Sequence, residues 1–93
     1  MPSADDFRDE LHGMMLEAMN AGKPFAEINA GKLHRRVGDY PGRRHRMPVC
    51  CQVMRATLAP DAGDTIVSQP PKGQGASLTI RYVLPRPVPI SSH

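Results

Sequence analysis

Two adjacent cysteines, Cys50 and Cys51, are the only thiols in this chain of 93 residues. Together with His34 and His45, they are the side chains whose types best suit a metal ion. Structural zinc sites, however, hold four ligands that are usually about two to four residues apart. Neighbouring residues on a helix point about 100° apart, so the two thiols would not both reach one ion. We therefore expect no metal site, and we expect reduced thiols in a cytoplasmic protein.

Nucleophilic catalysis is the other chemistry that these residues suggest. A cysteine could act as the nucleophile, a histidine as the base, and Asp39 as the group that orients the base. Such residues must converge in a pocket, and a chain this short builds only a small core. The sequence also lacks a Walker-type phosphate loop and a dinucleotide fingerprint. We expect no enzyme, no catalytic residues, no cofactor and no small-molecule substrate.

Basic residues are concentrated in the middle of the chain, where Arg43, Arg44, His45 and Arg46 are consecutive. Residues 1–31 carry six acidic and two basic side chains, whereas residues 32–55 carry seven basic side chains and one acidic one. This asymmetry favours a polyanionic partner. The alternative is a solubilising surface, but charges spread for solubility are usually of mixed sign.

The elements that must position these residues begin with a helix at 4–20. Ser3 and Asp6 have the spacing of a capping box. Apolar residues then recur at helical spacing, namely Phe7, Leu11, Met14, Met15 and Ala18. Asn20, Gly22 and Pro24 end the helix. A short extended segment at 25–28 follows.

Two more helices are expected in the basic half of the chain. Asn29 can cap the first of them, which faces the core with Leu33 and Val37 and ends at Gly38. The second occupies about 47–58, because Pro48 suits a first turn and Pro60 ends the helix. Its apolar stripe comprises Val49, Val53 and Ala56, with Cys50, Met54 and Leu58 beside it. Its outward residues are Cys51, Gln52 and Arg55.

Strand periodicity appears only after residue 64. Residues 65–68 form a short β run, and 69–76 form a loop with two prolines and two glycines. The buried face of the next strand follows by strict alternation, at Leu78, Ile80, Tyr82 and Leu84. The two runs predict an antiparallel hairpin. We expect one domain at 1–85 and a flexible proline-rich tail at 86–93.

The order of these elements resembles the winged helix-turn-helix superfamily. Four segments are also similar to small bacterial domains found alone or beside restriction-type nucleases: residues 33–38 (LHRRVG), 40–42 (YPG), 45–51 (HRMPVCC) and 73–78 (GQGASL). The resemblance implies an α+β winged helix-turn-helix fold, with three helices followed by a two-stranded antiparallel wing. It also implies that helix 47–58 enters the major groove of duplex DNA, while wing 69–76 touches the flanking backbone or minor groove.

The chemistry of individual residues agrees with that reading. Arginines before helix 47–58 can neutralise phosphates. Gln52 has the chemistry to read adenine, and Arg55 has the chemistry to read guanine. Lys72 and Gln74 lie at the hairpin tip. The candidate DNA-binding residues are Lys32, Arg35, Arg36, Arg43, Arg44, His45, Arg46, Gln52, Arg55, Lys72 and Gln74.

The expected role is that of a transcription regulator or a targeting module of a restriction or defence system. The main alternative is a protein-interaction module, such as a phage- or plasmid-type inhibitor or adaptor of a nucleic-acid-handling complex. A structural or homodimerisation domain is a third reading. No apolar run approaches the ~20 residues that cross a bilayer, and no secretory signal is recognisable. We expect no membrane partner.

Overall fold

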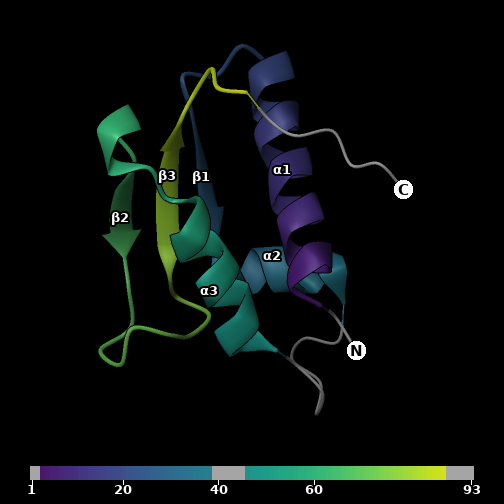
Figure 1. The fold of residues 1–93 in the computed structure, drawn as a ribbon, viewed down its shortest axis with the longest axis vertical. Helices are drawn as coiled ribbons and strands as arrows, with labels where there is room; N and C mark the ends of the chain where they lie inside the picture. Colours follow the sequence, from purple (N-terminus) through teal and green to yellow (C-terminus); the bar gives the residue numbers. More distant parts are fainter. Residues whose placement is uncertain (1–2, 39–45, 88–93) are drawn as a thin grey trace.

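The computed structural model describes residues 3–38 and 46–87. Within these two ranges, three α-helices, one short 3₁₀ helix and three strands follow one another (Figure 1). In chain order they are α1 (Ala4–Asn20), β1 (Phe25–Asn29), α2 (Ala30–Val37), α3 (Met47–Thr57), η1 (Pro60–Ala62), β2 (Thr65–Ser68) and β3 (Thr79–Val83).

Helix α1 begins with the predicted capping box. The Ser3 hydroxyl accepts a hydrogen bond from the Asp6 backbone N–H at 3.2 Å, and the Asp6 carboxylate accepts one from the Ser3 N–H at 2.8 Å. These two bonds satisfy N–H groups that a helix start leaves without an internal partner. The helix runs over the predicted residues and buries Phe7, Leu11 and Met15.

The sheet has three antiparallel strands in the order β1-β3-β2. The predicted antiparallel hairpin of β2 and β3 is confirmed, but the sheet has a third strand, because the extended segment at 25–28 pairs with β3. Ala26 lies opposite Tyr82, and Ile28 lies opposite Ile80. This register places the apolar side chains of both strands on one face, where the helices cover them. The domain is thus a small α+β domain with three helices and a three-stranded antiparallel sheet.

Helices cover one face of the sheet, and the core lies between them and β3. Ile80 and Tyr82 are completely buried, whereas Arg81 between them is exposed. The Tyr82 hydroxyl donates a hydrogen bond to the Met54 carbonyl of α3 at 2.8 Å. Within the described ranges, no helix is both long and apolar enough to span a membrane.

The buried side of α3 differs from the prediction at two positions. Cys51 was expected to point outward, but its side chain is fully buried. Ala56 was expected in the core stripe, but it is exposed. Cys51 is buried because the loop between β2 and β3 packs against its side of the helix, where the Cys51 thiol contacts Gly75.

The start of α2 touches the same loop. Asn29 caps the helix as predicted, and its side chain accepts a hydrogen bond from the Lys32 N–H at 3.1 Å. The Gly31 N–H donates to the Ala76 carbonyl at 3.1 Å. A Cβ atom at Gly31 would lie 3.2 Å from the Ala76 Cβ and 3.3 Å from the Ala76 carbonyl oxygen. A methyl group at this position would therefore crowd the contact between helix and loop.

We expect Gly31→Ala to lower the free energy of unfolding by about 1–3 kcal/mol, because the methyl group overpacks a backbone contact. Urea unfolding measures the change. The matched control is Gly13→Ala in the interior of α1, where nothing lies within 4 Å of the added Cβ. That variant should gain up to about 1 kcal/mol from helix propensity. Equal effects at both sites would contradict the close contact between α2 and the loop.

Candidate nucleic-acid interface

The exposed stripe of α3 contains Pro48, Gln52 and Ala56, which are spaced four residues apart. Gln52 is the one side chain of this stripe with strong hydrogen-bonding groups. Its carboxamide can donate and accept at a base edge. The small neighbours above and below it allow a partner to approach the helix closely.

Arg55 does not point outward as a base-reading residue would. Its Nη2 donates to the Gly73 carbonyl at 2.6 Å and to the Gln69 side-chain oxygen at 3.0 Å. Gly73 has φ +82°, a left-handed conformation that favours glycine. Arg55 therefore ties α3 to the loop between β2 and β3, which we call the hairpin loop (residues 69–78).

Cys51 makes a second tie between α3 and the hairpin loop. Its thiol donates to the Gly75 carbonyl at 3.5 Å and accepts from the Gly75 N–H at 3.4 Å. Burial raises the pKa of Cys51, although the Gly75 N–H and the Arg55 charge oppose the shift. Burial raises the pKa of Cys50 to about 12. Both thiols are therefore protonated at neutral pH and act as packing and hydrogen-bonding groups.

No metal-binding group stands out among these side chains. Within residues 3–38 and 46–87, no three side chains of histidine, cysteine, aspartate or glutamate are grouped as a metal ion requires.

The hairpin loop presents two exposed polar side chains, Lys72 and Gln74, on either side of Gly73. The loop lies at the same end of the molecule as the start of α3 (lower part of Figure 1). Because Arg55 holds Gly73, the positions of Lys72 and Gln74 relative to α3 are set by the protein itself. The two predicted parts of the interface, helix and loop, are thus brought together.

Lys32, Arg35 and Arg36 are exposed on α2. Arg36 donates to Glu17 at 2.9 Å and to Glu10 at 3.0 Å, both on α1. The hydrogen bond to Glu17, helped by the Glu10 charge, raises the pKa of Arg36. Two glutamates of α1 therefore neutralise Arg36, which is one of the predicted DNA-binding arginines.

The start of α3 is joined to α2 by a buried histidine. His34 is fully buried, and its Nε2 accepts a hydrogen bond from the Arg46 backbone N–H at 2.8 Å. The Phe7 ring meets the His34 ring edge-on at 4.8 Å. The hydrogen bond between His34 and the Arg46 N–H fixes where the chain enters α3. The other candidates of the basic run lie outside the described residues, so their contacts stay predictions: Arg43, Arg44 and His45.

Analysis of the sequence alone missed the residues that anchor the hairpin loop. Gln69 and Cys51 were taken as loop and surface residues, yet both contribute to the ties with α3. Helical periodicity gives no sign of such ties, because they depend on how a loop 14 to 24 residues further along the chain folds back.

Comparison with models of protein families, with curated proteins and with solved structures finds no significant match to this chain.

Proposed function

We propose that this chain is a winged helix-turn-helix domain that binds duplex DNA and performs no chemistry on it. In this proposal α3 enters the major groove with Gln52 at a base edge. The hairpin loop acts as the wing and places Lys72 and Gln74 on the flanking backbone or minor groove. Lys32 and Arg35 of α2, together with the basic run before α3, neutralise phosphates.

The observation that carries the proposal is the double tie between α3 and the hairpin loop. Arg55 and Cys51 hold Gly73 and Gly75, so helix and loop form one preordered unit. A unit that is ordered in advance avoids the entropic cost of ordering a loop on binding. The element order and the central position of β3 in the sheet also suit a winged helix.

The proposal implies modest sequence selectivity. The Arg55 guanidinium is hydrogen-bonded to the hairpin loop. Gln52 is therefore the main side chain of α3 for base contacts. A good bidentate contact discriminates by about 1–3 kcal/mol. Most of the affinity should therefore come from phosphates and from the shape of the groove. A regulator or a targeting module of a restriction or defence system in the cytoplasm would suit such a domain.

A duplex titration at two salt concentrations tests the proposal. With at least three phosphate contacts, the logarithm of the binding constant should fall with the logarithm of salt with a slope of about −2.7 or steeper. Lys32→Ala with Arg35→Ala should weaken binding about tenfold and make the slope shallower by about 1.8. Mobility shift or fluorescence anisotropy measures both quantities.

Arg36→Ala is the matched control, because Arg36 lies on the same helix and its guanidinium is bound to Glu10 and Glu17. It should leave the slope unchanged. If the wild-type protein binds no duplex at the lowest salt, or binds with no salt dependence, the proposed function is wrong.

A further inference from the structure

The outer edge of β1 carries backbone groups that face away from the sheet. β1 is an edge strand, since β3 is its neighbour on one side and the order of the sheet is β1-β3-β2. The Ala30 N–H just after β1 donates to the Leu78 carbonyl at 2.8 Å. Bonded and non-bonded residues alternate along an antiparallel pair. The N–H and C=O groups of Phe25 and Glu27 therefore point toward the open edge.

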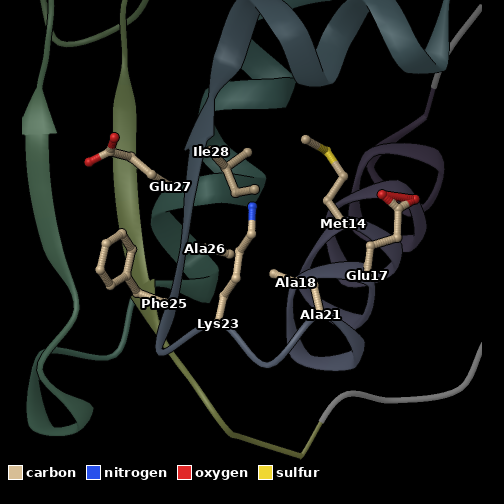
Figure 2. Close-up of a pocket in the computed structure, with 9 residues that line it drawn as sticks. All are labelled: Met14, Glu17, Ala18, Ala21, Lys23, Phe25, Ala26, Glu27 and Ile28. Carbon is tan, nitrogen blue, oxygen red and sulfur yellow. The ribbon is translucent and has the colours of Figure 1, made fainter.

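This open edge borders a groove between α1 and β1 with a volume of about 340 Å³ (Figure 2). The groove has mostly apolar walls, which come from Met14, Ala18, Ala21, Ala26 and Ile28. Three of these five side chains are alanines, so the groove is open beside the strand. An extended chain laid along β1 would have backbone partners on one side and an apolar wall on the other.

Two of the three charged side chains that line the groove form ion pairs. Glu17 binds Arg36 at 2.9 Å, and Glu27 binds Arg81 at 3.1 Å. Among residues 3–38 and 46–87, Lys23 forms no ion pair. Figure 2 shows its side chain running beside Ala26, with the ammonium group in the groove. The groove thus has an unmatched positive charge, and its two carboxylates are already matched.

We propose that this groove binds an extended acidic peptide segment of another protein, which adds a strand to the edge of β1. Its backbone pairs with Phe25 and Glu27, its small apolar side chains contact the α1 wall, and a carboxylate meets Lys23. A second copy fits less well, because the Glu27 that its own β1 would bring is already bound to Arg81. No groove residue belongs to the candidate DNA-binding set, so the domain can hold a duplex and a protein segment together.

A labelled hexapeptide Val-Thr-Asp-Thr-Val-Thr, whose valines and aspartate share the face toward the groove, is titrated into the full chain to test the proposal. We expect saturable anisotropy changes, and NMR shifts concentrated at the amides of Phe25 and Glu27. Lys23→Glu should weaken this peptide about tenfold, because it removes one exposed ion pair and adds a repulsion. The same variant should bind the peptide with lysine in place of the aspartate better than the wild type does.

Lys72→Glu is the matched control, since Lys72 is an exposed lysine outside the groove, and it should leave peptide binding unchanged. Ala21→Trp should block binding by filling the groove from an exposed position on the α1 side. Equal binding of the acidic and basic peptides, or shifts located elsewhere, would overturn the proposal. NMR shifts of the β1 amides that change with protein concentration in the absence of peptide would also overturn the proposal. They would assign the groove to a second copy of the chain. Duplex affinity, measured in parallel, reports on the DNA-binding proposal separately.

Discussion

Replacing Asp64 with alanine is expected to lower the free energy of unfolding by about 3–5 kcal/mol. The Asp64 side chain is completely buried and accepts three hydrogen bonds. These come from Val83 N at 2.7 Å, Ala59 N at 2.9 Å and the Arg86 guanidinium at 2.6 Å. Alanine would leave all three donors without the acceptor that the buried carboxylate supplies, which costs far more than losing an exposed ion pair. Urea unfolding followed by circular dichroism measures the change.

Asp64 should also make the free energy of unfolding depend on pH in the acidic range. Burial by itself would raise the pKa of Asp64, but the hydrogen bonds from Arg86 and the two backbone N–H groups outweigh it and hold the pKa below the ordinary 3.8. A carboxylate with a lowered folded-state pKa stabilises the fold above its unfolded pKa. That contribution is lost as the pH falls from about 4 through the folded pKa.

Two variants separate this effect from general acid unfolding. Asp64→Asn should flatten the dependence of stability on pH below about 4, because the titrating group is gone. Asp61→Ala removes an exposed aspartate nearby, and it should stay within about 0.5 kcal/mol of the wild type. If Asp64→Asn kept the full acid dependence, other carboxylates would be responsible for it.

Replacing Arg55 with alanine should weaken duplex binding about 30-fold, equivalent to about 2 kcal/mol. The variant loses both hydrogen bonds from the guanidinium, to Gly73 and Gln69. The hairpin loop must then be ordered on DNA at an entropic cost. Arg55→Lys should restore part of the affinity, because an ammonium can still donate to the Gly73 carbonyl. Anisotropy titrations with several duplex sequences, and hydrogen exchange at the Gly75 amide, measure the two effects.

The effect of Arg55→Ala on duplexes of different sequence distinguishes two roles for Arg55. A residue that positions the loop weakens all duplexes alike and speeds exchange at Gly75, whereas a guanine-reading arginine relaxes one base preference and leaves exchange unchanged. The second pattern would contradict the structural role. Gln52→Ala is the matched control on the same helix, and it should relax sequence preference without affecting the loop.

Local sequence signals predicted most of the helices and β3. The Ser3 capping box, the Asn29 cap and the proline at position 48 each act within a few residues of where they stand. Their effects therefore do not depend on the rest of the fold. The alternation from Leu78 to Leu84 worked for the same reason, since a half-buried strand shows its two faces in its own sequence.

The failures all involve contacts between distant segments. The segment at 25–28 was recognised as extended, but its partner β3 lies more than 50 residues away, and nothing local reveals that pairing. Cys51 was assigned outward from helical periodicity, which does not register a loop that packs over one side. Likewise, nothing near Arg36 in the sequence indicates that two glutamates of α1 bind it.

The central place of β3 has a consequence for how the protein is made. Both β1 and β2 pair only with β3 among the described strands, and β3 is the last of them along the chain. During synthesis, neither earlier strand has its neighbour until residues 79–83 have left the ribosome. Nascent chains stopped before Thr79 should therefore lack a sheet and be open to proteases, and protection should arise abruptly once β3 emerges.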